Sequence, residues 1–200
     1  MMNSVMQHIR KLWPQKRWKR ILLISLLVLT IVAASLLVYA SVGMNADVIT
    51  ELVVKNPQGT KAALILYHPG LSSFSHDVAY AFADGLTSSG WRVEIATPSI
   101  GAPTDLSKYS LLVVSSNTYG FNPDKPTIRH LERIGNLNEI QTVLMTLGAG
   151  SAQESKQSLE NTIQASNGII VKSLLLYSVA PNEEGKSAIE IATQEAQQIT

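Results

Sequence analysis

The chain contains no cysteine among its 200 residues, and this absence excludes disulfide bonds, thiolate nucleophiles and cysteine-held metal ions. Histidine is scarce as well, and the histidines present do not have the spacing of metal ligands. No internal repeat or low-complexity run occurs. We therefore expect no bound metal, and any chemistry must depend on other groups. The four histidines are His8, His68, His76 and His130.

Charge is absent from a long stretch near the N-terminus, where no Asp, Glu, Lys or Arg occurs in residues 21–46. Residues 21–43 consist mostly of Leu, Ile, Val and Ala, and at about 1.5 Å per residue such a helix crosses a hydrocarbon core of about 30 Å. We therefore predict a transmembrane helix at residues 21–43. A cleaved signal peptide is the alternative, because residues 38–40 resemble a small-residue cleavage site, but the length of the apolar run favours a retained anchor.

The first 20 residues form a basic segment that contains six positive charges and no acidic residue. Trp13 and Trp18 stand where interfacial aromatic residues anchor a membrane helix. The positive-inside rule places this segment in the cytoplasm, so we predict a single-pass protein of the cell membrane whose remaining chain is extracytoplasmic and whose first partner is the lipid bilayer. The six basic residues are Arg10, Lys11, Lys16, Arg17, Lys19 and Arg20.

The portion after Gly43 has the opposite charge balance. The whole chain carries +1, and without the six N-terminal charges 10 basic and 15 acidic residues remain, which is a balance of −5. An acidic domain is not suited to nucleic acid, so we expect no such partner. Residues 44–60 are predicted to be a juxtamembrane linker or an edge strand, because 48–54 has the composition of a strand and 56–59 is a turn signal.

Strand-like and helix-like segments alternate through residues 61–200. The alternation predicts a parallel sheet covered by helices on both faces, which is a doubly wound α/β domain. Residues 97–109 contain Pro98, Gly101 and Pro103, so no full-length helix is expected there. The expected strands are 62–67, 91–96, 110–116, 141–147 and 169–179. The expected helices are 75–90, 127–134, one opened by a Ser151-x-x-Glu154 capping box, and 182–199. Gly90 is expected to close the first in the left-handed conformation. The last is expected to point Ile189, Ala192 and Ala196 inward.

Three loops follow strands of the predicted sheet and are expected to meet at its carboxyl edge, where ligands bind in such folds. They are residues 68–75, 117–122 and 148–151. The first contains Ser72, Ser73 and Ser75 at the start of a helix, where free amides and the helix dipole favour an anion. The alternative interpretation is that these serines only cap the helix.

The domain resembles the flavodoxin-like family in three stretches. Ser72-Ser73-Phe74-Ser75 occupies the place of that family's hydroxyl-rich phosphate loop, where the family usually has Thr-Gly-Asn-Thr. The stretch from Asp105 through Tyr109 to Ser116-Asn117-Thr118-Tyr119-Gly120 is similar to the family's approach to the loop over the flavin ring. Leu147-Gly148-Ala149-Gly150 is similar to its small-residue third loop.

This resemblance implies a five-stranded parallel sheet of order 2-1-3-4-5, bound FMN, and electron transfer to an unidentified redox partner protein. FMN is favoured over a dinucleotide because no Gly-x-Gly-x-x-Gly motif is present. Tyr119 is expected to stack on the flavin, and the glycines are expected to let the backbone approach it. The implied cofactor-binding residues are Gly70, Ser72, Ser73, Phe74, Ser75, Asn117, Thr118, Tyr119, Gly120, Gly148, Ala149 and Gly150.

No general base or nucleophile emerges from the sequence, so redox chemistry would belong to the cofactor. Two other functions stay open. An α/β-hydrolase-type esterase is disfavoured because no Gly-x-Ser-x-Gly motif exists, and the serine of the Gly148–Ala152 stretch is displaced. A flavodoxin-like binding or scaffold module without flavin fits the absence of catalytic residues equally well.

Overall fold

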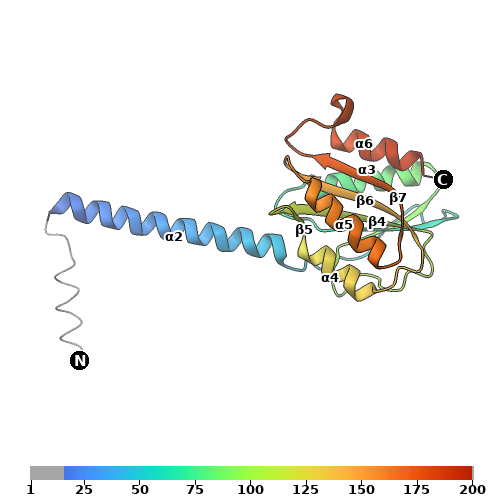
Figure 1. The fold of residues 1–200 in the computed structure, drawn as a ribbon, viewed down its shortest axis with the longest axis horizontal. Helices are drawn as coiled ribbons and strands as arrows, with labels where there is room; N and C mark the ends of the chain where they lie inside the picture. Colours follow the sequence, from blue (N-terminus) through green and yellow to red (C-terminus); the bar gives the residue numbers. More distant parts are fainter. Residues whose placement is uncertain (1–15, 200) are drawn as a thin grey trace. The chain divides into compact units, whose positions relative to one another are not determined.

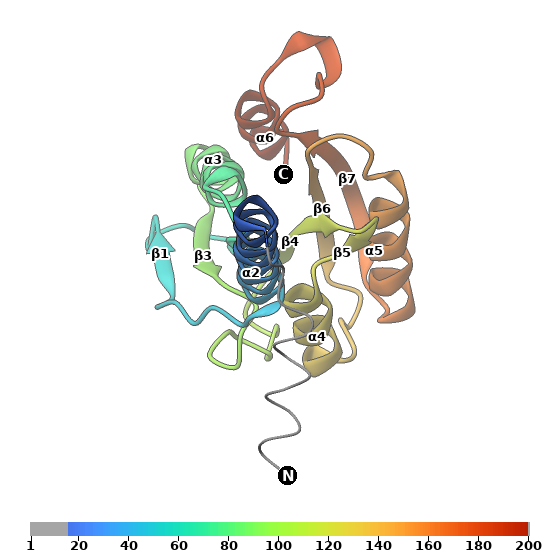
Figure 2. The same ribbon diagram turned by 90° about the vertical axis from the view of Figure 1, so that its left-hand side faces the viewer.

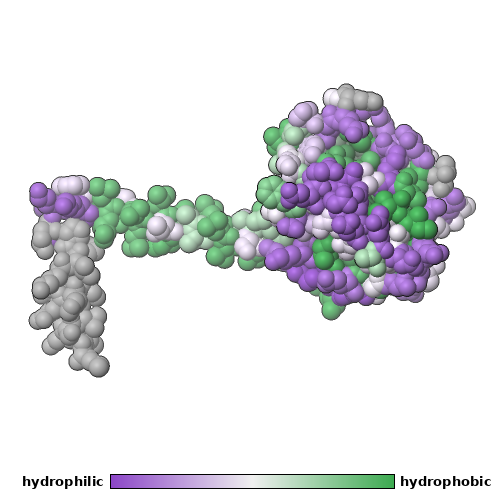
Figure 3. All heavy atoms as spheres, in the orientation of Figure 1, coloured by the Kyte–Doolittle hydropathy of each residue, from purple (hydrophilic) through white to green (hydrophobic). Residues whose placement is uncertain are grey.

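The structure is a computed structural model that describes residues 16–199, and it divides between Val42 and Gly43 into two compact units. Helix α2 (Arg17–Asn45) begins four residues before the predicted span and ends two residues after it. Its side chains are exposed and mostly apolar, as the green spheres along α2 show (Figure 3). Within residues 16–199 it is the one helix long and apolar enough to cross a membrane. The predictions for Arg10, Lys11 and Trp13 lie outside the described residues.

The second unit contains a sheet of mostly parallel strands in the order β1-β3-β2-β4-β6-β7 (Figure 1). The five parallel strands have the predicted order 2-1-3-4-5. Strand β1 pairs antiparallel with β3, so residues 44–60 contribute an edge strand. The strands are β1 (Val53–Lys55), β2 (Ala62–Tyr67), β3 (Arg92–Ala96), β4 (Leu111–Tyr119), β5 (Asn122–Pro123), β6 (Gln141–Gly148) and β7 (Ile169–Tyr177).

Helices cover both faces of the sheet, as the doubly wound fold requires (Figure 2). Successive residues of a strand point to opposite faces. Ala63 and Ile65 of β2 accordingly pack with α3 and α6, whereas Leu64 and Leu66 pack with α4 and α5. Burial on both faces explains why β2 is an unbroken apolar run. The helices are α3 (Phe74–Ser88), α4 (Lys125–Ile134), α5 (Gln153–Ala165) and α6 (Ala188–Gln197).

Helices α3 and α6 pack closely because Gly85 has no side chain. A Cβ atom added to Gly85 would lie 2.5 Å from the carbonyl oxygen of Thr193 and 2.6 Å from the Cβ of Ala196. Gly90 follows α3 with a φ of 86°, which is the left-handed conformation predicted for it.

Several helix starts differ from the predictions, and α4 begins at Lys125, two residues before the predicted start. Helix α5 begins after Ala152, and no side chain caps it, so the predicted Ser151-x-x-Glu154 capping box is wrong. A capping box is present instead on α6, where Ser187 accepts from the backbone N–H of Glu190 and the Glu190 carboxylate accepts from the Ser187 N–H. The reason is register, because a capping box needs its serine at the residue just before the helix.

The C-terminal segment also differs from the single helix predicted for 182–199. A short 3-10 helix, η1 (Glu183–Gly185), precedes α6, and the chain between them is extended. Because α6 starts at Ala188, the inward residues are Ala188, Ala192 and Ala196, and Ile189 is 45% exposed. The predicted inward position of Ile189 is therefore wrong. Strand β4 also extends through Tyr119, so residues 117–119 are strand and not loop.

Candidate functional site

The three predicted loops meet at the carboxyl edge of the sheet, around a cleft of about 160 Å³. The cleft is formed by the loop after β2, the end of β4 and the loop after β6. Seven of the twelve predicted cofactor residues line it. They are Ser72, Phe74, Asn117, Thr118, Tyr119, Gly148 and Ala149, and Leu71, Leu147 and Ser178 complete the lining.

Gly70 lets the first loop pass directly under the end of β4. Its φ is 69°, and a Cβ atom there would lie 2.7 Å from the Tyr119 hydroxyl and 2.9 Å from the Asn117 Nδ2 atom. Asn117 Nδ2 donates to the His68 carbonyl oxygen over 2.7 Å. The first two loops are therefore held together, and only glycine fits at the point of contact.

The Tyr119 hydroxyl lies against the first loop, close to Gly70 and within the influence of the Leu71 backbone N–H. Burial raises the pKa of Tyr119, the nearby charge of Asp124 raises it further, and the Leu71 N–H opposes these two effects. The net effect is a pKa above the ordinary value of a tyrosine. Tyr119 thus lies against the loop that was predicted to bind phosphate.

The three serines of the first loop have different surroundings. Ser72 is exposed and lines the cleft. Ser73 is the N-cap residue of α3, but its side chain makes no capping bond, and its hydroxyl contributes to lowering the pKa of Asp77. Ser75 is buried, and its hydroxyl donates to the His68 carbonyl oxygen over 2.7 Å. Ser72 is therefore the serine placed to face a ligand, and the capping role considered for Ser73 is not seen.

The second and third loops bring an unpaired hydroxyl and small residues to the cleft. Thr118 Oγ1 is buried and has no hydrogen-bond partner among the described residues. Gly120 adopts a φ of 55° in the turn between β4 and β5. A Cβ atom on Gly148 would lie 2.9 Å from the Cβ of Ala152, whereas one on Gly150 would meet open space. Gly120 and Gly150 therefore shape the loops beside the cleft without lining it.

Asp124 positions the second loop, and the sequence analysis did not single it out. The buried carboxylate accepts from Ser116 Oγ over 2.9 Å and from the Asn117 N–H over 2.8 Å. It also caps α4 by accepting from the Thr127 N–H over 2.9 Å. The signal was present, because an Asp followed by Pro126 near the helix start is typical of an N-cap.

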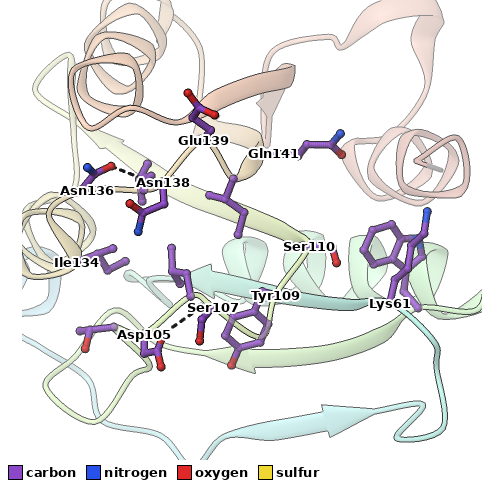
Figure 4. A pocket seen from close by; sticks show the side chains of 15 residues that line it. Lys61, Asp105, Ser107, Tyr109, Ser110, Ile134, Asn136, Asn138, Glu139 and Gln141 are labelled. Carbon is purple, nitrogen blue, oxygen red and sulfur yellow. Dashed lines mark hydrogen bonds between the residues drawn. The ribbon is translucent and has the colours of Figure 1, made fainter.

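A larger cavity of about 630 Å³ lies at the opposite edge, among the segments that precede β2, β4 and β6 (Figure 4). It is lined by polar residues such as Lys61, Asp105 and Glu139, and Asp105 accepts from the Ser107 N–H over 2.9 Å. None of the predicted cofactor residues lines it. Because doubly wound sheets bind ligands at their carboxyl edge, the smaller cleft remains the candidate site.

The candidate site contains no metal-binding arrangement. Among residues 16–199, no group of three or more His, Asp or Glu side chains is placed to hold a metal ion. The charged group nearest the second loop is Asp124, whose oxygens are occupied by Ser116, Asn117 and Thr127. What the site offers a ligand is backbone N–H groups, hydroxyls and an aromatic ring.

Comparison with known proteins places the second unit among known folds. No protein-family model matches the chain, and no curated protein matches it by sequence. Among solved structures, two-electron reduced Megasphaera elsdenii flavodoxin aligns with a TM-score of 0.57 at 10% identity, covering 68% of this chain and 98% of that one.

Two further flavodoxins give the same result. Oxidised Flavodoxin 2 from Bacillus cereus aligns with a TM-score of 0.56 at 14% identity, covering 68% of this chain and 95% of that one. A flavodoxin from the domain Archaea aligns with a TM-score of 0.55 at 14% identity, covering 69% and 94%. The strand order, the helices on both faces and these alignments agree, and the domain that follows α2 has the flavodoxin-like fold.

Proposed function

We propose that the protein is a membrane-anchored flavodoxin-like electron-transfer protein that binds FMN in the cleft at the carboxyl edge. The observation that carries this proposal is the meeting of the three predicted loops around one cleft, in a domain with the fold of flavodoxins. Bound FMN would supply the redox chemistry, and the protein would bind, orient and shield it. A redox partner protein would exchange electrons with it.

The residues at the cleft fit a flavin mononucleotide. The N-terminus of α3 offers amide donors that no side chain caps, together with the exposed hydroxyl of Ser72, and both favour a phosphate. The buried, unpaired hydroxyl of Thr118 offers a hydrogen bond to a polar edge. Tyr119 offers an aromatic face, and Gly148 and Ala149 leave the backbone accessible.

The cleft is small for FMN, so we expect the loops around it to move when FMN binds. Ligand sites usually measure about 300–1,000 Å³, whereas this cleft measures about 160 Å³. The first two loops are joined by the Asn117–His68 bond and by the contact of Tyr119 with Leu71. We expect the Tyr119 side chain to move away from the first loop when FMN binds.

The spectrum of the purified full-length protein in detergent tests the proposal. Flavin absorbance is expected, either as purified or after incubation with FMN and removal of the excess. The extracted cofactor, identified by chromatography, is expected to be FMN. A colourless protein that takes up no FMN would overturn the proposal, and FAD as the sole extracted flavin would overturn its choice of cofactor.

A flavin-free binding or scaffold module is the second candidate, and the small volume of the cleft favours it. In that case the Tyr119–Leu71 contact is a permanent part of the fold, and the loops do not open. The FMN titration separates the two candidates, because a scaffold would show no saturable change in flavin fluorescence.

A further inference from the structure

The parts of the loops nearest to the carboxyl ends of the strands contain no Asp, Glu, Lys or Arg, and Asp105, Asp124 and Glu183 are the charged residues that directly follow three of them. This is unusual in a domain whose overall balance is −5. At the opposite edge, the segments that precede the strands contain Lys61, Asp105, Lys108 and Glu139. The two edges of one sheet therefore differ in charge. The uncharged stretches are residues 68–73, 97–104, 118–123, 148–153 and 178–182, and two of them include the ends of neighbouring strands or a helix.

Four of these loops each expose a large apolar side chain. Leu71 is 51% exposed, Ile100 81%, Phe121 57% and Val179 82%. A single exposed apolar residue is ordinary, but four on neighbouring loops of one edge form an apolar rim. The φ of 67° at Phe121 is set by the two-residue hairpin turn between β4 and β5, because Gly120 also has a positive φ, and this turn holds the Phe121 side chain at the tip of the loop.

The chain joins the domain at this same edge. The Nε2–H of His68 donates to the Ala46 carbonyl oxygen over 3.1 Å, and Arg129 donates to the Asn45 carbonyl oxygen over 3.0 Å. Thr97, which begins one of the uncharged loops, donates to the Val48 carbonyl oxygen. The segment that follows the apolar stretch is therefore fixed to the edge that carries the apolar rim.

We propose that the apolar rim, formed by Leu71, Ile100, Phe121 and Val179, contacts the lipid interface of the membrane in which α2 is anchored. A domain of net charge −5 is repelled by anionic lipid, so an uncharged edge is the surface with which it can approach. Apolar side chains on loop tips then enter the boundary between headgroups and acyl chains. The inference rests on the proposed anchor but not on flavin binding.

A lipid occupant is favoured over a protein partner by the form of the rim. Protein interfaces centre on one packed patch of anchor residues. Here the four side chains lie on four different loops, and of the four only Leu71 lines the cleft. Separate apolar tips suit a fluid surface that adapts to each of them.

The absence of cysteine allows a direct test with single fluorescent labels on the full-length protein. Phe121→Cys and Val179→Cys would each be labelled with an environment-sensitive NBD group and reconstituted at one copy per nanodisc of phosphatidylcholine and phosphatidylglycerol. Nanodiscs with and without lipid that carries a shallow doxyl quencher would be compared. Ile169→Cys is the matched control, because Ile169 is 49% exposed but lies at the amino end of β7. Leu29→Cys in α2 reports insertion of the anchor.

Labels at 121 and 179 are expected to emit at shorter wavelength than the label at 169 and to lose emission with the quencher, as the label at 29 does. Circular dichroism of each variant checks that the domain is folded. If the labels at 121 and 179 behave like the label at 169 while position 29 is quenched, the proposal is overturned and the rim is left to a protein partner or a second copy. An unquenched label at 29 would refute the anchor and this inference with it, whatever the flavin content.

Discussion

The hydroxyl and the ring of Tyr119 are expected to have opposite effects on the affinity for FMN. Its hydroxyl lies against the first loop near the Leu71 N–H, whereas its ring offers an aromatic contact. A net hydrogen bond contributes about 0.5–1.5 kcal/mol, so Tyr119→Phe should strengthen FMN binding by roughly twofold to tenfold. Tyr119→Ala removes an aromatic contact of about 0.5–1.5 kcal/mol and should weaken binding by a similar factor. Fluorescence titration measures both, and a tighter Ala variant would contradict the stacking role.

Glu94 is a buried carboxylate whose charge is expected to stabilise the fold. Burial raises its pKa, but hydrogen bonds from Tyr109 and Lys108 and the charges of Lys108 and Arg92 outweigh this, so its pKa is lowered overall. Its oxygens accept over 2.6 Å from Tyr109, 3.0 Å from Lys108 and 2.7 Å from Arg92. Glu94→Gln should therefore cost about 1–3 kcal/mol of unfolding free energy at pH 7.

The lowered pKa of Glu94 also predicts how its contribution to stability changes with pH. A depressed carboxylate pKa stabilises the fold above the unfolded value, about 4.3 for Glu, and this contribution disappears as pH falls through the lower folded value. Urea unfolding at pH 7 and near pH 3 should show the cost of Glu94→Gln shrinking in acid. An equal cost at both pH values would assign the loss to packing instead of charge.

At the residue scale, the sequence predicted which residues line the cleft better than it predicted the hydrogen bonds that they make. The loops converge because strand ends in a parallel sheet converge, and hydroxyls and glycines in those loops were visible in the sequence. The direction of the Ser75 hydroxyl toward His68 and the position of Tyr119 near Leu71 depend on contacts between distant segments. No local pattern encodes such contacts.

At the scale of one element, the starts of α6 and α5 allow a direct comparison between a serine that caps a helix and one that does not. Ser187 caps α6 with both bonds of a capping box, whereas Ser151 caps nothing. Removing a capping serine costs about 0.5–2 kcal/mol. Ser187→Ala should therefore lower the unfolding free energy by about 1 kcal/mol, and Ser151→Ala should leave it nearly unchanged. Urea unfolding of both variants tests this, and equal losses would contradict the assignment of the cap.

The packing of α3 against α6 depends on Gly85. A Cβ atom there would lie 2.5 Å from the Thr193 carbonyl oxygen, which is backbone and moves only with α6. Overpacking of this kind costs about 1–3 kcal/mol, and this should outweigh the gain in helix propensity from Gly85→Ala. Gly150→Ala, where the added methyl group meets open space, is the control. Thermal unfolding should show a lowered midpoint for Gly85→Ala alone.

Elements were predictable where a pattern repeats over many residues, and their ends were less predictable. Strand β2 is recognised because both its faces are buried, and α3 because its apolar residues recur at helical spacing. The start of α5 was misplaced because Ser151 and Glu154 have the spacing of a capping box without its register. The extension of β4 through Tyr119 was missed because polar residues such as Asn117 pair there with β6.

At the scale of the whole molecule, the strand order followed from the resemblance, but the role of the linker did not follow from composition. Residues 53–55 pair antiparallel with β3, and nothing in three residues of β-prone composition selects a sheet edge over a tether. The charge split between the N-terminal segment and the domain is a property of the whole sequence, and it leads to a prediction about topology.

The positive-inside rule predicts that the domain is extracytoplasmic, because all six basic residues of the N-terminal segment precede the uncharged run. The chain has no cysteine, so one introduced cysteine reports one position. Glu183→Cys, on the exposed η1, should react with a membrane-impermeant maleimide in intact cells. Ser4→Cys, in the basic segment, should react only after lysis. The reverse labelling pattern would show that the domain is cytoplasmic. Release of the Glu183→Cys protein from the membrane fraction would instead indicate a cleaved signal peptide.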